Sequence, residues 1–198
     1  MDISKIKEFI SSWMARIPLS YFNDPDPVVS VIRLSGIIGQ VGPGRSGLTL
    51  DGLEKSIERA FSGKRVKTVA LVINSPGGSP VQSAQIARRI RELAEEKDIT
   101  VVAFTEDVAA SGGYWLACAA DEIFADANSI IGSIGVVSAG FGFTEAIERL
   151  GVERRVHTMG KRKGMLDPFM PEVPEDIARL KAIQMDIHDS FKQMVLDR

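Results

Sequence analysis

Two glycine-rich turns hold the residues of this chain that are best suited to chemistry. Ser75-Pro76-Gly77-Gly78 and Ala110-Ser111-Gly112-Gly113 each follow an apolar run and precede a segment with helical periodicity. At the carboxyl ends of parallel strands, such turns lie where ligands bind. A serine at the position of Ser111 is exposed at the start of a helix, where unpaired N–H groups and the helix dipole stabilise negative charge. The pattern predicts nucleophilic attack by the Ser111 hydroxyl.

The glycines near Ser111 meet the second requirement of such a reaction, which is stabilisation of an oxyanion. Gly112 leaves the N–H group after Ser111 uncrowded, and Gly78 brings a second backbone donor to the same oxygen. A purely structural interpretation is also open, in which both turns are tight strand-to-helix connections and Ser111 is an ordinary N-cap. Residue types and spacing alone do not decide between the two interpretations.

The base that would activate Ser111 is not fixed by the residues alone. His157 is a candidate, but no recognisable motif surrounds it. A lysine serves only if burial lowers its pKa from a reference value of about 10.4. Lys163 and Lys161 both belong to a basic cluster over residues 154–163, which is also the composition of a solvated surface.

Alternating strands and helices are expected to position these turns. Apolar, β-branched runs over 28–39, 66–74 and 99–105 are typical of buried parallel strands, and segments with helical stripes separate them. The fold class predicted is therefore α/β, built from stacked βαβ units with a parallel sheet and flanking helices. Later elements are predicted as strands over 122–126 and 132–138, a strand ending in a loop over 152–164, a short helix over 143–150 and a long helix from Pro174. Gly39 to Gly47 is predicted as a loop.

The first residues form a separate predicted element. We expect an amphipathic helix and linker over residues 1–24 and the main domain over 25–198. The helical stripe consists of Ile6, Phe9, Ile10, Trp13, Met14 and Ile17. No apolar run there exceeds three residues, so neither a secretory signal nor a transmembrane segment is predicted. The helix is expected to pack on its own domain or a sister subunit, or else to contact a membrane surface peripherally.

Composition excludes several classes of function. The chain has 198 residues, of which 44% are hydrophobic and 25% charged, with a formal net charge of −2. This is the profile of a soluble globular domain, and it offers no basic field to recruit nucleic acid. Cys118 is the only cysteine and there are two histidines, so no disulfide, metal site or cofactor is expected.

The combination NSPGG, ASGGYWLACAAD and IIGSIGVV resembles the signal peptide peptidase A family of serine–lysine peptidases, within the crotonase and Clp-protease fold group. The resemblance runs from about residue 28 to residue 192. It implies that Ser111 is the nucleophile and that Gly78 and Gly112 donate to the oxyanion. It further implies that Lys163, in the Gly-x-x-Lys motif beginning at Gly160, is the base, assisted by Ser133.

The predicted substrate is an extended polypeptide. Residues 132–138 and 79–82 are suited to pair with it as added strands, and the candidate binding residues are Ser79, Gly132, Ile134, Gly135 and Val136. The family resemblance implies hydrophobic peptides such as signal peptide remnants. It also implies a ring-like homo-oligomer in which neighbouring subunits help to build each active site, so that Lys163 meets Ser111 either within one chain or across a subunit interface.

Relatives in this family continue beyond the last helix, and many begin with a membrane-spanning helix. The predicted final helix has no stop signal before Arg198. We therefore expect a truncated form or a fragment, either soluble or held peripherally at a membrane.

Three other functions are weighed against the serine–lysine peptidase. A crotonase-type acyl-CoA enzyme is the first, because it uses the same paired-glycine oxyanion hole. Such enzymes normally place a carboxylate in the site. Glu106 and Asp107 precede the Ser111 turn, but no motif assigns either of them to that role. A non-catalytic peptide-binding or assembly subunit is the second. Nucleotide binding is the third, because residues 39–46 resemble a phosphate-binding loop, although Arg45 replaces the lysine and Pro43 removes an N–H group.

Overall fold

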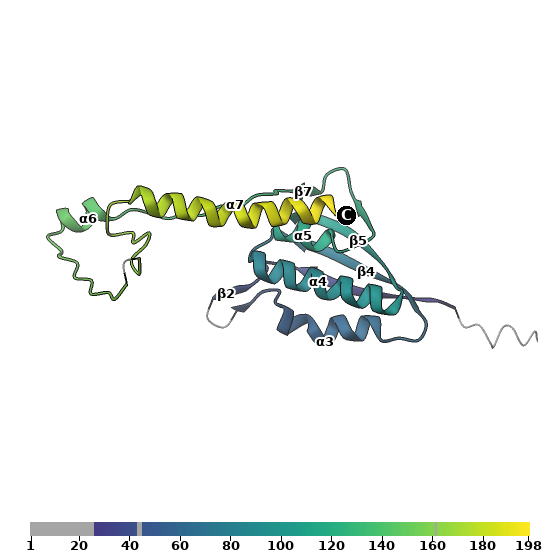
Figure 1. Ribbon diagram of the computed structural model, residues 1–198. Helices are drawn as coiled ribbons and strands as arrows, with labels where there is room; N and C mark the ends of the chain where they lie inside the picture. The colour runs from purple at the N-terminus through teal and green to yellow at the C-terminus, as the bar shows by residue number, and fades with distance from the viewer. Residues whose placement is uncertain (1–25, 43–44, 161) are drawn as a thin grey trace, which may run out of the picture.

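The computed structural model describes residues 26–42, 45–160 and 162–198 (Figure 1). The predicted N-terminal helix over residues 1–24 lies outside the described residues. The strands are β1 (Val28–Ser35), β2 (Gln40–Gly42), β3 (Arg45–Ser46), β4 (Val66–Ser75), β5 (Thr100–Ala110), β6 (Glu122–Ala125) and β7 (Ile130–Gly132). The helices are α3 (Leu50–Phe61), α4 (Pro80–Lys97), α5 (Gly112–Ala117), α6 (Thr144–Arg149) and α7 (Pro174–Leu196).

One parallel sheet forms the centre of the molecule. Its strands follow the order β1-β4-β5-β6, and β7 pairs with the carboxyl end of β5. Every pairing in this sheet is parallel. The predicted α/β class with a parallel sheet and flanking helices is confirmed.

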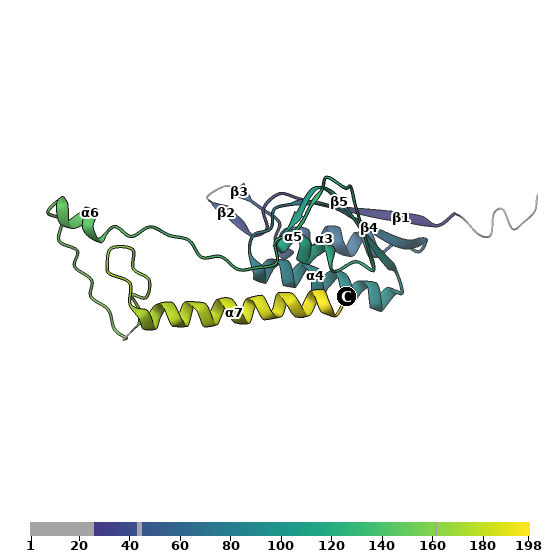
Figure 2. The same ribbon diagram turned by 90° about the horizontal axis from the view of Figure 1, so that it is seen from above.

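The helices that connect the strands all cover the same face of the sheet, as Figure 2 shows for α3 and α4. The strands are added in one direction across the sheet, and right-handed βαβ crossovers then place every helix on one side. The core lies between this face and the helices. Its largest fully buried apolar side chains are Leu34, Ile38, Ile57, Val69, Leu71, Ile73, Ile86, Ile90, Val101 and Leu116.

Local signals explain where α4 begins and ends, and α4 follows the first glycine turn directly. The Ser79 hydroxyl accepts a hydrogen bond from the Gln82 N–H group at 3.4 Å, and Pro80 occupies the first helical position. At the other end, Asp98 adopts the left-handed conformation that closes a helix, with φ of 53°. The start of α4 is therefore fixed beside the turn.

An arm projects from this body. Residues 133–160 and 162–173, including α6, extend away from the sheet, and α7 returns along the arm to the body (Figure 1, green to yellow). The end of α7 is anchored by Phe191, whose ring stacks on that of Trp115 in α5 with centroids 4.7 Å apart. Phe191 is the only buried residue of α7, so most of this helix has no covering partner among the described residues.

The arm is where the sequence-based prediction of secondary structure was wrong. Residues 152–160 form neither strand nor helix, and the predicted strand over 132–138 is reduced to Ile130–Gly132. A strand needs a neighbour to accept and donate its backbone hydrogen bonds, and no described strand lies beside these segments. The predicted loop over 39–47 instead contains the short hairpin of β2 and β3.

Candidate active site

Ser111 lies in a strained turn between β5 and α5. Its backbone has φ of 52° and ψ of −122°, a conformation that costs a non-glycine residue about 1–3 kcal/mol. Its N–H group donates to the Gly132 carbonyl at 2.7 Å, and its carbonyl accepts from the Trp115 N–H group at 3.0 Å. Its side chain makes no capping hydrogen bond, which argues against the interpretation of Ser111 as an ordinary N-cap.

The first glycine turn presses directly against this second one. A Cβ atom on Gly77 would lie 2.7 Å from the Gly112 nitrogen and 2.8 Å from the Ser111 Cβ. A Cβ atom on Gly113 would lie 2.4 Å from the Ser75 carbonyl oxygen. These distances are too short for any side chain, so only glycine permits the two turns to approach this closely.

Two backbone donors in these turns have no partner among the residues that the structure describes. The N–H groups of Gly78 and Gly112 donate to no acceptor in the part of the chain that the structure describes. Gly78 is exposed, and its neighbours hold it in place: Ile38 donates to the Gly77 carbonyl at 2.9 Å, and Ser79 donates to the Ile38 carbonyl at 2.8 Å. Both donors are free to bind a developing oxyanion.

Sequence reasoning missed the residues that brace the turns. The buried Ser75 hydroxyl donates to the Gly36 carbonyl at 2.6 Å and accepts from the Gly77 N–H group at 3.2 Å. The buried Ser83 hydroxyl donates to the Ser79 carbonyl at 2.9 Å. A Cβ atom on Gly112 would lie 2.3 Å from the Ser83 oxygen. In the sequence, Gly77 of the Ser75-Pro76-Gly77-Gly78 turn was the one signal that the two turns lie so close together.

The predicted binding segment after Ser111 begins in contact with it. Gly132 ends β7 and accepts the Ser111 hydrogen bond, and Ser133 follows with φ of 55° and an exposed side chain. Ile134 and Gly135 are exposed and Val136 is half-buried, and none of the three belongs to a helix or strand. The structure therefore brings Ser111 and Gly132 together and leaves the following backbone unpaired.

On the opposite side of the turns, the predicted binding residue Ser79 is half-buried at the start of α4. A hollow of about 600 Å³ lies beside it, lined by residues of the hairpin base, α3 and α4 such as Gln40, Asp51 and Gln82.

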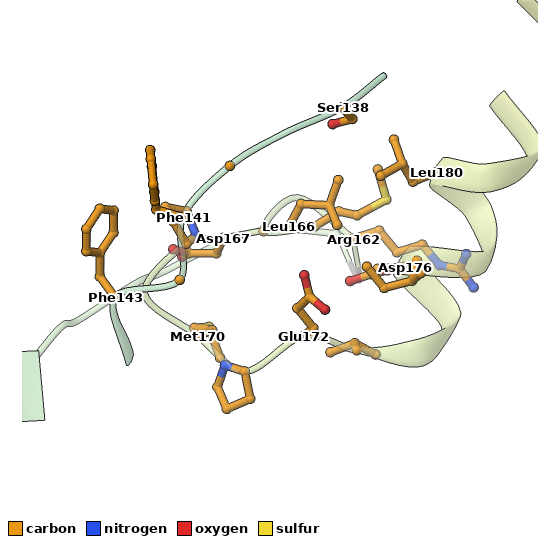
Figure 3. Close-up of a pocket in the computed structure, with 18 of the residues that line it drawn as sticks. Ser138, Phe141, Phe143, Arg162, Leu166, Asp167, Met170, Glu172, Asp176 and Leu180 are labelled. Atoms are coloured by element: carbon orange, nitrogen blue, oxygen red, sulfur yellow. The ribbon is translucent and has the colours of Figure 1, made fainter. Parts of the chain in front are cut away.

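Lys163 lies on the arm, away from Ser111 of the same chain. It is exposed, and its sequence neighbours Arg162 and Gly164 line a hollow of about 800 Å³ together with Asp176 and Leu180 of α7 (Figure 3). About 25 Å of helix separates Pro174, at the start of α7, from Phe191, which contacts the helix that follows Ser111. The structure therefore does not bring Lys163 to Ser111 within one chain. The alternative base, His157, is also exposed on this arm.

The described residues contain neither a membrane-spanning helix nor a cluster of metal ligands. None of the helices there is both long and apolar enough to cross a bilayer. That same part of the chain has no group of three or more histidine, cysteine or acidic side chains placed to hold a metal ion.

Comparisons with known proteins identify a peptidase family. The model of peptidase family S49 matches residues 93–198, which is more than half of the chain. A protein of Brucella melitensis named Na(+)/H(+) antiporter NhaA is 53% identical over 178 residues, covering 89% of this chain and 24% of that protein. A putative signal peptide peptidase SppA of Enterococcus faecium is 34% identical, covering 67% of this chain and 38% of that protein.

A plant relative adds the catalytic type. The chloroplastic serine protease SPPA of Arabidopsis thaliana is 36% identical over 156 residues, covering 74% of this chain and 23% of that protein. The chain thus spans between about a quarter and two fifths of the length of these relatives. From the family match and the relatives together, we conclude that the chain belongs to peptidase family S49, the signal peptide peptidase A family of serine peptidases.

Proposed function

We propose that this chain is part of a serine endopeptidase in which the Ser111 hydroxyl attacks the peptide carbonyl. The observation that carries the proposal is the strained Ser111 turn, whose side chain makes no cap and which lies against the Gly77 turn. The N–H groups of Gly112 and Gly78 would hold the oxyanion formed by the attack. One such donor typically contributes about 3 kcal/mol to transition-state stabilisation.

The proposed base is Lys163 of a neighbouring copy of the chain. The arm that carries Lys163 exposes large apolar side chains, among them Val137 (88% exposed) and Met159 (92% exposed). Exposed apolar surface of this kind is typical of interfaces. An amine acts as a base only where its charged form is removed from water, and a subunit interface supplies such a site.

In the proposed mechanism, the neutral Lys163 amine takes the proton of the Ser111 hydroxyl as its oxygen bonds to the carbonyl carbon. The resulting ammonium then gives that proton to the leaving amine, and an acyl-enzyme forms on Ser111. Water, deprotonated by the same amine, hydrolyses the ester. Ser133, which is exposed and directly follows the end of β7 at Gly132, is the proposed hydrogen-bond partner of the lysine.

The proposed substrates are extended, hydrophobic peptides, including signal peptide remnants. Support comes from the unpaired backbone after Gly132 and the exposed side chain of Ile134, which suit addition of a peptide as a strand. Ser79 is the proposed contact on the other side of the site. The name of the Enterococcus relative, a putative signal peptide peptidase, refers to the same substrate class.

Labelling by a fluorophosphonate tests the identity of the nucleophile. The Ser111→Ala protein should lose both labelling and peptide cleavage. The matched control is Ser62→Ala, which removes another hydroxyl at the end of α3, outside the proposed site. The control should keep both activities. Labelling that persists in Ser111→Ala would show that another residue is the nucleophile.

A further inference from the structure

The arm joins the body at two places, and both lie at the Ser111 turn. The arm begins after Gly132, the last residue of β7, whose carbonyl accepts the Ser111 N–H group at 2.7 Å. It returns to the body at Phe191 of α7, whose ring stacks on that of Trp115 in α5 (Figure 1). The Trp115 N–H group in turn donates to the Ser111 carbonyl at 3.0 Å. One root of the arm therefore holds the Ser111 N–H group directly, and the other reaches the Ser111 carbonyl through Trp115.

The Ser111 turn needs support of this kind. Its φ of 52° and ψ of −122° form a conformation that persists in a residue with a side chain only where the surroundings over-determine it. The helix that follows, α5, has six residues, which is too short for a helix to be stable without packing. Ser111 itself makes no side-chain capping bond to α5. The packing of α5 must therefore keep the turn in place.

The stack of Trp115 on Phe191 is the part of this packing that comes from α7. Trp115 is 7% exposed, and its N–H group closes the first turn of α5 onto Ser111. Phe191 is the one residue of α7 that the described structure buries, so the body end of this helix is placed by its ring. Without that ring, Trp115 loses its stacking partner and the first turn of α5 is free to shift.

We propose that Phe191 is a positioning residue for the nucleophile, an inference that rests on the proposed role of Ser111. By fixing Trp115, the Phe191 ring fixes the hydrogen bond to the Ser111 carbonyl and with it the strained turn. The Gly112 N–H group follows Ser111 directly, so it depends on the same support. Phe191 thus acts on the rate of attack at Ser111, and it acts through Trp115 rather than by touching the reacting atoms.

Fluorophosphonate labelling of Phe191→Leu tests this role, with Phe61→Leu as the matched control. Both phenylalanines are 2% exposed, so each substitution removes a buried ring of the same size. Phe61 ends α3 and lines a hollow with Val66, at the amino end of β4, whereas Ser111 follows the carboxyl end of the parallel strand β5. Only the Phe191 substitution should therefore disturb the Ser111 turn. Phe191→Met, which is closer to phenylalanine in volume, takes the place of Phe191→Leu if that variant does not fold.

Labelling should be about three- to tenfold slower in Phe191→Leu than in Phe61→Leu, which is the rate equivalent of losing one aromatic pair. In peptide cleavage, kcat should fall by the same factor while KM stays unchanged, because the ring acts on the nucleophile and not on the bound peptide. Both variants are compared when fully folded and in assemblies of the same size, as measured by light scattering.

Equal labelling rates in the two folded variants would overturn the positioning role. So would a slowing that disappears between assemblies of the same size, or a raised KM with unchanged kcat. Labelling of the native chain that persists in Ser111→Ala would instead overturn the proposed nucleophile, so the two failures are distinguishable.

Discussion

Replacing Gly77 by alanine tests whether the contact between the two glycine turns positions Ser111. Gly77 has φ of 96°, and an added Cβ would lie within 2.8 Å of the Gly112 nitrogen, the Ala110 oxygen and the Ser111 Cβ. The positive φ alone costs an alanine about 1–2 kcal/mol. Crowding of backbone atoms adds about 1–3 kcal/mol, as overpacking does elsewhere.

Gly36 provides a matched control for this substitution. Its φ is 101°, nearly that of Gly77, but nothing lies within 4 Å of an added Cβ. Gly36→Ala should therefore cost only the conformational term of about 1–2 kcal/mol. Gly77→Ala should cost about 2–5 kcal/mol, because both terms apply.

The two variants should differ most in reactivity. Moving Ser111 and the Gly112 N–H group out of place removes an oxyanion donor, so fluorophosphonate labelling of Gly77→Ala should slow by about 10²–10³. Gly36→Ala should label at nearly the native rate. The free energy of unfolding is measured by urea titration followed by circular dichroism, and labelling is measured under conditions where both variants are folded. Equal labelling rates for the two folded variants would refute the proposed positioning role.

One stability effect and one pH effect follow from the packing of α5 and of Cys118 at its end. Phe191→Ala should lower the free energy of unfolding by about 3–5 kcal/mol, because it removes a buried ring stacked on Trp115. Its control is Phe141→Ala on the exposed arm, which should change the free energy of unfolding by less than about 0.5 kcal/mol in the same urea titration. Burial raises the pKa of the Cys118 thiol, so on raising the pH the unfolded chain loses this proton before the folded chain does. The free energy of unfolding contributed by Cys118 should therefore fall as pH rises above the usual thiol pKa. A Cys118→Ala variant should show a smaller loss of stability between neutral and alkaline pH; an unchanged pH dependence would contradict this.

The order of elements in the body of the fold could be predicted from the sequence because each apolar run has a distinct local signal. The run over Val66–Ser75 is long, β-branched and followed by Ser79-Pro80, which start a helix. The same reasoning placed Ser111 at a turn between a buried strand and a helix, and its role as the nucleophile stays a prediction. These features depend on residues close together in the chain.

The parts that could not be predicted depend on contacts between distant residues. The hydrogen bond from the Ser75 hydroxyl to the Gly36 carbonyl depends on the pairing of β1 with β4, and sequence spacing does not encode it. The segment over residues 152–160 has strand-like composition but lies on the arm without a described neighbour, so its composition was misleading. The position of Lys163 on that arm likewise depends on α7, whose length sets how far the arm extends.

Complementation between two inactive variants tests the central claim most directly. Ser111→Ala supplies the lysine but no nucleophile, and Lys163→Ala supplies the nucleophile but no lysine. If the dyad forms between neighbours in a ring, mixing the two before assembly should restore peptide cleavage to about a quarter of the native rate, because one interface in four pairs the two intact residues. Each variant alone should be inactive. A mixture as inactive as its components, in assemblies shown to contain both chains, would contradict the proposed dyad.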